Sequence, residues 1–427
     1  MNRLLRKAVL AVVAGICADA ALAGEAALPE ALRAALPSRE AAVAAIDGDT
    51  LVLRASAERA AAAARAQGYE RGPHDWVGGA GYASRDVAQD QRYDEWELSV
   101  QRGIRLPAKA DADRRLARME QEAATFAFAD ARHAAAVALL EAWIAWRGAM
   151  DQERITREAA AMAVEDLRIV ELRVRNGDAA AADLDAAQAA QAQAASSTRM
   201  AALAVEEARI TLDVRFPGLA LPASPAALPE PAAPTVALPA WAERVVEHNH
   251  EIELAQARAD LAALQAQRAR LDRRGDPVVG IRALSERGGD EQAVGVFVNV
   301  PLGSGARRFA AAEQADLANA AATVAVQVRR EVQRDAQVLL ARAQGSLEAW
   351  QSAAAATRAA ASHRERLQRG LALGGVRVSE LLEARRRLLE AERAELAARA
   401  TALTAIARLL LDAHAYWIDD GDHAEEP

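Results

Sequence analysis

The sequence is poor in several residue types, and each shortage excludes a class of protein. Cysteine occurs once in 427 residues, as Cys17, so no disulfide framework can form within the chain. Aromatic residues make up 4% of the chain although the hydrophobic class reaches 52%, so most of the apolar content is alanine. Alanine builds narrow seams between helices rather than a bulky core, which favours helical bundles or coiled coils.

Long apolar runs, excess positive charge and catalytic motifs are also missing. No stretch after the N-terminal segment reaches about 18 consecutive apolar residues, which predicts that no helix spans a membrane. The formal net charge is -8, so nucleic acid is not an expected partner. Lysine is almost entirely replaced by arginine, with Lys109 the only lysine after Lys7. No Ser-His-Asp set, zinc-ligand spacing, P-loop or dinucleotide fingerprint is present, so we expect no enzyme, cofactor or metal site.

The N-terminal segment, residues 1–23, has the pattern of a secretory signal peptide. Three basic side chains precede an apolar run that ends in Ala21-Leu22-Ala23, with small residues at the two recognition positions. Its removal takes away three basic residues and one acidic residue, so 52 basic and 60 acidic residues become 49 and 59, a net charge of -10. Lipidation of Cys17 is the alternative, which Ile16 disfavours because it is a poor residue before a lipoprotein cleavage site.

The most prominent feature that is present is a very long helical pattern from Pro107 to Gly177. It is dominated by good helix formers and has no internal proline up to its end. At about 1.5 Å per residue it would span roughly 100 Å, which a compact globule cannot accommodate. The order of strand, proline, long helix, glycine turn and returning helix occurs again in the second half. Pro301 follows Pro107 by 194 positions, and Gly374 follows Gly177 by 197.

Two hairpins precede the two long helices, at about residues 75–106 and 277–302. In the first, Trp96, Leu98 and Val100 alternate with polar residues, the period-2 pattern of a strand with one apolar face. In the second, the alternating apolar residues are Val294, Val296, Val298 and Val300. Strands of about ten residues can cross a membrane, but about eight are needed for the smallest barrel, and open edges are excluded from lipid. Either the strands lie outside a membrane, or several copies of the chain close one barrel.

Other segments complete the plan. We expect further helices at about Glu30 to Ala45, Leu51 to Gln67 and Trp241 to Arg273. Segment 214–240 contains seven prolines and predicts an extended connector. It separates two structural repeats, residues 24–213 and 241–414, whose long coiled-coil helices cover about 107–213 and 305–414. The acidic tail, residues 415–427, is expected to fray.

The combination of a signal peptide with two copies of this plan resembles the TolC-like outer-membrane factor family, the exit ducts of tripartite efflux pumps and type I secretion systems. The second hairpin is similar to the branch attached to heavy-metal resistance pumps of the RND class. The usual Asn-Pro signature before the first hairpin is not recognisable, and His248-Asn249-His250-Glu251 stands in its place in the second half. The segments that carry the resemblance are Gly103-Ile104-Arg105-Leu106-Pro107, Asn299-Val300-Pro301-Leu302-Gly303, Arg175-Asn176-Gly177-Asp178, and Gly374-Gly375 followed by Ser379-Glu380-Leu381-Leu382-Glu383-Ala384.

The resemblance implies a mainly α fold with a small membrane β part. Three copies would form a homotrimer with a twelve-strand barrel in outer-membrane lipid and an α-helical tunnel in the periplasm. It implies passive export of small molecules or metal ions, driven by an inner-membrane RND-type transporter through a periplasmic adaptor protein. The exit duct of a type I protein secretion system is an alternative of the same fold. A non-membrane periplasmic coiled-coil scaffold is an alternative of a different class, and the duplicated pattern argues against the adaptor itself.

Site residues follow from the resemblance by position. The glycine turns imply contacts with the adaptor at the periplasmic tip, at Gly177, Asp178, Gly374 and Gly375. The carboxylates that follow the turns imply a pore constriction, at Asp183, Glu380 and Glu383. In a trimer each carboxylate would be repeated into a ring of negative charge. The alternative for all of them is a solvated helix face, and an acidic residue such as Asp178 or Asp185 can also stabilise the start of the returning helix.

The histidines and tryptophans are interpreted as structural residues rather than as metal or ligand sites. His248 and His250 are two positions apart, so on a helix they point away from each other and do not predict a metal site. His414 and His423 lie near acidic residues in the expected tail. Trp143 and Trp146 are three positions apart on the long helix, which predicts packing in a seam between helices.

Overall fold

The computed structural model describes residues 28–303 and 305–418. The predicted signal peptide, Cys17 and the end of the acidic tail lie outside the described residues. The chain divides into two compact units. Of the described residues, unit 1 contains 28–54, 129–249 and 331–418, and unit 2 contains 55–128, 250–303 and 305–330.

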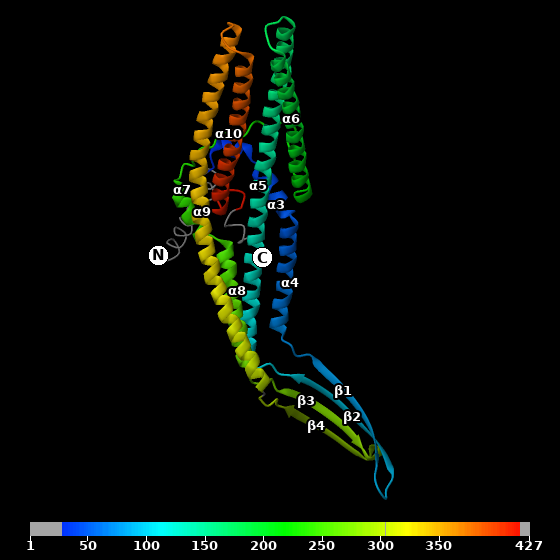
Figure 1. The fold of residues 1–427 in the computed structure, drawn as a ribbon. Helices are drawn as coiled ribbons and strands as arrows, with labels where there is room; N and C mark the ends of the chain where they lie inside the picture. Colours follow the sequence, from blue (N-terminus) through cyan, green and yellow to red (C-terminus); the bar gives the residue numbers. More distant parts are fainter. Residues whose placement is uncertain (1–27, 304, 419–427) are drawn as a thin grey trace, which may run out of the picture. The chain divides into compact units, whose positions relative to one another are not determined.

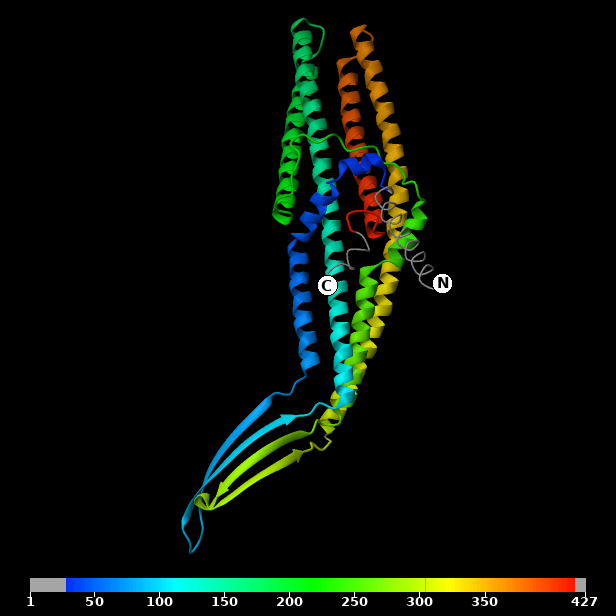
Figure 2. The same cartoon turned by 180° about the vertical axis from the view of Figure 1, so that it is seen from behind.

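The elements follow one another in a duplicated order (Figures 1 and 2). Each long helix is followed by a shorter helix that returns alongside it. The division between the units falls within α4, α5 and α9 and between α7 and α8. The helices are α2 (Glu30–Ala35), α3 (Arg39–Asp47), α4 (Thr50–Arg71), α5 (Pro107–Arg175), α6 (Ala181–Arg215), α7 (Leu238–Glu247), α8 (His250–Asp272), α9 (Gly305–Ala372) and α10 (Val378–Asp412), with a short 3₁₀ turn η1 (Arg287–Gly289). The strands are β1 (Trp76–Asp86), β2 (Arg92–Gly103), β3 (Val278–Glu286) and β4 (Glu291–Asn299).

Unit 1 has its core where α5 and α10 carry leucine and tryptophan among the alanines. Trp143 and Trp146 are 4% and 3% exposed, with ring centroids 5.2 Å apart, so they pack as their spacing predicted. The Trp143 indole N–H donates to the Ala35 carbonyl over 2.9 Å, which satisfies its one polar group. Other fully buried side chains of this core are Ile46, Leu139, Leu140, Leu403, Ile406, Leu409 and Leu410.

Two predicted helices are interrupted in the structure. The expected helix from Glu30 to Ala45 breaks after Ala35, because Pro37 disfavours a helical conformation in the residue before it. The next helix, α3, begins after Ser38, which caps it: the Ser38 hydroxyl accepts a hydrogen bond from the Ala41 N–H over 3.3 Å. The expected helix from Trp241 to Arg273 is likewise two helices, because α7 ends at Glu247 and α8 begins at His250.

The predicted fraying after His414 is wrong for the first residues of the tail. Residues 415–418 are 1 to 3% exposed, and Tyr416 donates from its hydroxyl to the Ala407 carbonyl over 2.9 Å. Burial raises the pKa of the Tyr416 phenol well above its usual value. The aromatic content of this short segment offsets its lack of regular structure.

The proline-rich connector has no helix or strand between residues 216 and 237. Side chains of the core helices bind its backbone instead. The Leu228 N–H donates to Asp151 over 2.7 Å, and its carbonyl accepts from Arg399 over 2.9 Å. Arg147 donates to the Ala226 carbonyl over 2.5 Å. The connector is therefore held in place although prolines prevent it from joining a ladder.

One stretch of α5 is apolar enough on average, and long enough, to cross a membrane. Half of that stretch is buried inside the structure, as in the core helix of a bundle. We therefore take it as part of the helical core rather than as a span.

Unit 2 contains one antiparallel sheet in the order β1-β2-β3-β4 (Figure 1). Trp96 lies opposite both Tyr82 and Ser285, and Val296 lies opposite Ile281. The second strand ends at Gly103, three residues before the predicted end, so Ile104 lies outside the sheet. Its N–H donates to the Pro277 carbonyl over 2.7 Å, and this hydrogen bond connects the residue after β2 to the residue before β3.

Candidate functional site

The register of the sheet gives it two chemically different faces. Residues that lie opposite each other share a face, so even-numbered positions of β1, β2 and β4 join odd-numbered positions of β3. We call this side the apolar face, although Arg92, Asp94 and Arg102 also lie on it. Its large apolar side chains are Trp76, Tyr82, Trp96, Leu98, Val100, Val279, Ile281, Val294, Val296 and Val298. All of them are exposed, from 41% for Val279 to 82% for Val296. A row of exposed apolar side chains on this scale marks a surface that is covered by something else.

The opposite side, the polar face, carries Glu95, Glu97, Ser99, Gln101, Arg282 and Asn299 along with several glycines. Val77, Val278, Leu284 and Phe297 are apolar exceptions on this face, and Phe297 is the largest of them. Its ring lies over Gly280, where an added Cβ would meet the ring Cζ at 2.4 Å. The aromatic ring thus covers a strand position that has no side chain, a known way to support glycine in a sheet.

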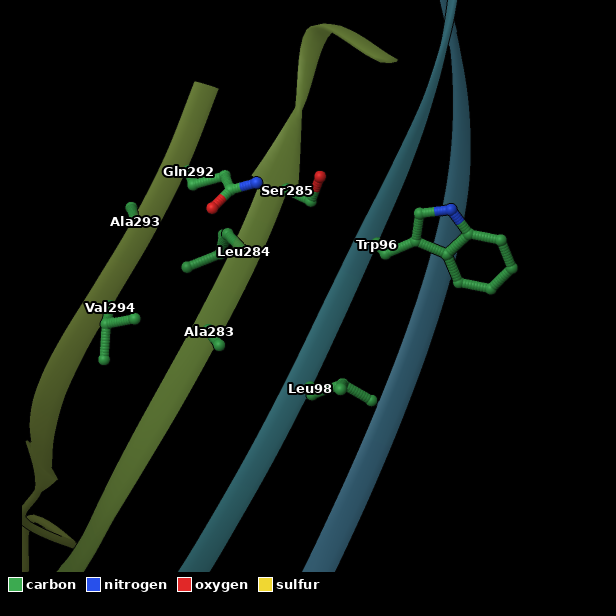
Figure 3. Close-up of a pocket in the computed structure, with 8 residues that line it drawn as sticks. All are labelled: Trp96, Leu98, Ala283, Leu284, Ser285, Gln292, Ala293 and Val294. Atoms are coloured by element: carbon green, nitrogen blue, oxygen red, sulfur yellow. The ribbon is translucent and has the colours of Figure 1, made fainter. Parts of the chain in front are cut away.

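A shallow depression of about 230 Å³ lies near the η1 end of the sheet (Figure 3). Its lining includes Trp96 and Leu98 on β2, Ala283 on β3 and Val294 on β4. Beside it, the rings of Tyr82 and Trp96 lie 4.8 Å apart.

The edges of the sheet are unpaired within the described residues. There β1 pairs only with β2, and β4 pairs only with β3. Each edge presents a row of backbone N–H and C=O groups that hydrocarbon cannot satisfy. The sheet is therefore open at both edges within the described part of the chain.

The two predicted tip turns have the same backbone structure. Gly177 and Gly374 adopt left-handed φ values of 81° and 77°, which favour glycine. After α5, the Asp178 N–H donates to the Arg173 carbonyl over 2.8 Å and the Gly177 N–H to Val174 over 3.0 Å. After α9, the corresponding bonds run from Gly375 to Gly370 and from Gly374 to Leu371, at 3.0 and 3.1 Å. Both turns are Schellman motifs, which satisfy the last carbonyls of a helix.

The predicted constriction carboxylates all have local partners. Asp183 accepts from the Ala180 N–H over 3.1 Å and so caps α6. Glu380 pairs with Arg377 at 2.9 Å, and Glu383 pairs with both Arg386 and Arg387 at 2.8 Å. The hydrogen bonds from those two arginines lower the pKa of Glu383. Glu383 therefore stays ionised at neutral pH, and arginine charge lies beside both Glu380 and Glu383.

The turns are also connected through a small core. Val170 of α5, Ala187 of α6 and Val378 of α10 are buried together, so the start of each returning helix packs near the end of α5. Next to them Arg385 forms an ion pair with Asp166. Burial raises the pKa of Asp166 despite that pairing, because desolvation exceeds the attraction to the guanidinium.

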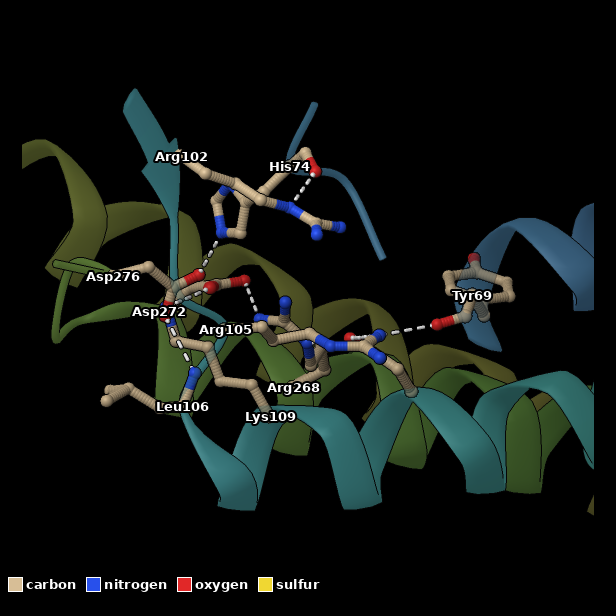
Figure 4. A network of polar contacts seen from close by, with 10 residues as sticks. Tyr69, His74, Arg102, Arg105, Leu106, Lys109, Arg268, Asp272 and Asp276 are labelled. Carbon is tan, nitrogen blue, oxygen red and sulfur yellow. Dashed lines mark hydrogen bonds and ion pairs between the residues drawn. The ribbon is translucent and has the colours of Figure 1, made fainter. Parts of the chain in front are cut away.

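A polar network that the sequence did not predict lies where the strands meet the helices of unit 2 (Figure 4). Lys109 is 3% exposed, and its Nζ lies 2.9 Å from carboxylate oxygens of both Asp272 and Asp276. Asp276 also contacts His74 Nε2 at 2.8 Å and accepts from the Leu106 N–H over 3.3 Å. Burial acts to raise the pKa of Asp276, but the hydrogen bonds from His74, Lys109 and Leu106 outweigh it and lower that pKa.

The network continues through Asp113, which is buried between two arginines. Arg105 contacts it at 2.9 Å and Arg268 contacts it at 2.5 Å. Arg105 also donates to the carbonyls of Tyr69 and Glu70, over 2.5 and 2.7 Å. These bonds join α4, α5, α8 and the ends of the strands. The interacting residues lie far apart in the sequence, as much as 202 positions for His74 and Asp276. The only sequence signal that could have pointed to the network is that Lys109 is a lysine in a chain that has almost none.

Among residues 28–303 and 305–418, no group of three or more His, Cys, Asp or Glu side chains is arranged to hold a metal ion. His248 follows the last residue of α7, and His250 is 6% exposed and pairs with Glu253 at 3.1 Å. His414 adopts a left-handed φ of 54°, and its ring lies 5.6 Å from that of His133.

Known structures share this arrangement. A membrane protein from Pseudomonas aeruginosa matches with a TM-score of 0.73 at 16% identity, over 90% of this chain and 94% of that one. The fold is that of a TolC-like outer-membrane channel. The MtrE outer-membrane channel of Neisseria gonorrhoeae, in its open state, has a TM-score of 0.69 at 16% identity over 89% of both chains. The CmeC outer-membrane channel of Campylobacter jejuni has a TM-score of 0.68 at 14% identity, over 92% of this chain and 88% of that one.

By sequence alone, the chain matches no protein-family profile and no curated protein. The channel fold is thus reached through the order and geometry of the elements. That order is the four-stranded sheet and the two pairs of long helices described above.

Proposed function

We propose that this chain is the outer-membrane exit duct of a tripartite efflux system, located in the bacterial outer membrane and extending into the periplasm. The observation that carries the proposal is the open sheet with an exposed apolar face and two unpaired edges. Four strands cannot close a barrel, but three copies would supply twelve, an even number within the range of known single barrels. The apolar face would meet outer-membrane lipid, and the polar face would line the lumen.

The helices support a homotrimer independently of the sheet. In α6, Met200, Leu203, Ile210 and Val214 follow one another at spacings of 3, 7 and 4 and are 48 to 77% exposed. That spacing places them in one stripe along the helix, the seam of a coiled coil. Within the described residues the stripe has no cover, and a neighbouring copy of the chain would supply it.

The turns and carboxylates receive roles within this proposal. The turns at Gly177, Asp178, Gly374 and Gly375 would meet a periplasmic adaptor, which joins the duct to an inner-membrane RND-type pump. Asp183, Glu380 and Glu383 would be repeated around the three-fold axis at the periplasmic constriction. Because Glu380 and Glu383 have arginine partners, such a ring would have less negative charge than its carboxylates alone suggest.

The cargo would be small molecules or metal ions. The assignment to the branch attached to heavy-metal resistance pumps is supported only by the sequence of the second hairpin. An exit duct for protein secretion would have the same fold and remains the alternative within this class. The organisation into repeats at residues 24–213 and 241–414 also stays a prediction. A non-membrane periplasmic scaffold is the alternative of another class.

The deciding experiment is to fractionate cells and to measure the mass of the species extracted from the outer membrane, with bound detergent subtracted. We expect three copies of the chain and no recovery without detergent. A monomer in the soluble periplasmic fraction would contradict the proposal, since the apolar face and the sheet edges would then need no membrane.

A further inference from the structure

The two tip turns share a backbone but present different surfaces. At the spacing of 197 positions that relates Gly177 to Gly374, Leu373 corresponds to Asn176. Leu373 is 88% exposed, so a leucine side chain stands in solvent at the apex of the α9/α10 turn. The equivalent apex of the α5/α6 turn is a polar amide. One turn therefore offers an apolar anchor and the other does not.

The backbone that carries Leu373 is fixed before any partner arrives. The Leu373 N–H donates to the Arg369 carbonyl over 3.2 Å, and the Schellman bonds at Gly374 and Gly375 follow directly. Val376 then folds back against Gly370, where an added Cβ would lie 2.6 Å from a Val376 methyl group. A rigid apex loses little conformational entropy on binding, which favours its use as an anchor.

The two turns also differ in net charge. Residues 366–380 contain Arg366, Arg369 and Arg377 against Glu380, a net charge of +2. The equivalent residues 169–183 contain two arginines against Glu171, Asp178 and Asp183, a net charge of -1. The side chains of Arg369 and Arg377 are 69% and 82% exposed. These two guanidinium groups already have acidic neighbours in the chain, Glu365 at 3.7 Å from Arg369 and Glu380 at 2.9 Å from Arg377. Such exposed pairs contribute little, so a partner's carboxylates can replace them.

We propose that the α9/α10 turn is a docking knob for a protein whose surface offers an apolar socket bordered by Asp and Glu. Leu373 is the anchor, and Arg369 and Arg377 pair with the acidic border. This rests on the proposed function, because the partner is the protein that an exit duct meets at its periplasmic tip. It narrows that function, because the α5/α6 turn does not supply the anchor. A membrane surface fits less well, since one leucine buries too little area for stable membrane binding.

The test uses the full-length chain in its own bacterium, with the photoreactive amino acid benzoylphenylalanine in place of Leu373. The matched control carries it in place of Asn176, at the equivalent position of the other turn. After irradiation we expect one adduct with a second protein, about tenfold more abundant from position 373, a ratio equivalent to about 1.4 kcal/mol. Mass spectrometry of the adduct should identify a partner peptide that lies among acidic residues.

Charge reversal completes the test. Arg369→Glu combined with Arg377→Glu should lower the adduct at position 373 by about tenfold, because like charges then face each other across the contact. Equal adducts at the two positions, an adduct only with another copy of this chain or with lipid, no adduct, or no response to charge reversal would each overturn the knob. The mass of the extracted species is measured on the same preparations. A trimer without the expected adduct refutes the knob alone, whereas a soluble monomer refutes the proposed function.

Discussion

At the residue scale, Lys109 is 3% exposed and pairs with one nearly buried carboxylate, that of Asp276, and with one half-exposed carboxylate, that of Asp272. Substitution by Met would leave Asp272 and Asp276 without their shared cation, and breaking a buried pair in this way costs about 3 to 5 kcal/mol. We expect Lys109→Met to lower the midpoint of thermal unfolding measured in detergent. Arg114→Met on the same helix is the control, because Arg114 is 55% exposed and pairs with an equally exposed Asp111. Similar losses from the two variants would contradict a special role for Lys109.

Asp276 makes the same network sensitive to acid. Its pKa in the folded chain lies below the value of 3.8 that is usual for an exposed aspartate. The ionised carboxylate therefore contributes stability above that value, and the contribution disappears as the pH falls through the folded pKa. We expect Asp276→Asn to be less stable than the parent at pH 6, and the difference to shrink as the pH is lowered to about 2. A difference that is constant over this range would contradict the assignment.

At the element scale, the left-handed glycines that end the long helices should be more sensitive than glycines inside them. Gly374→Ala forces an alanine to a φ of 77°, which costs about 1 to 2 kcal/mol. Gly345 lies inside α9 with nothing within 4 Å of an added Cβ. There Gly345→Ala should stabilise the helix by about 0.5 to 1 kcal/mol. Unfolding midpoints that shift in the same direction for both variants would contradict this reading of the turns.

The elements also show what a sequence can predict. Period-2 alternation at Trp96 to Val100 and glycine after a long alanine-rich helix are local signals, and both gave the correct kind of element. The break at Pro37 was also signalled locally and was missed, because the alanine pattern continues on both sides of it. The ion pairs of Asp276 could not be predicted, since His74 lies 202 positions away and its approach depends on how strands and helices meet. The packing of residues 415–418 likewise depends on a surface formed by distant helices.

At the scale of the whole molecule, the proposed barrel makes the two faces of β4 unequal. Val296→Arg would place a charge on the apolar face, which costs about 2 to 4 kcal/mol near the middle of a bilayer. Gly295→Arg places the same charge one residue away on the polar face, where an added Cβ meets nothing within 4 Å. We expect the first variant to lower the yield of trimer in the outer membrane and the second to leave it nearly unchanged. Equal yields would mean that the apolar face does not meet lipid.

The rarity of lysine gives the molecule an unusual chemical property. The sequence has only two lysines, Lys7 and Lys109, and the side chain of Lys109 is 3% exposed. Reagents that acylate amines modify the surface of most proteins at many places, but here they can reach a side chain only when the joint between strands and helices opens. The rate at which Lys109 is acylated then reports how often that local opening occurs. The chain thus carries a built-in reporter of the mobility of its strands, with no need for an added label.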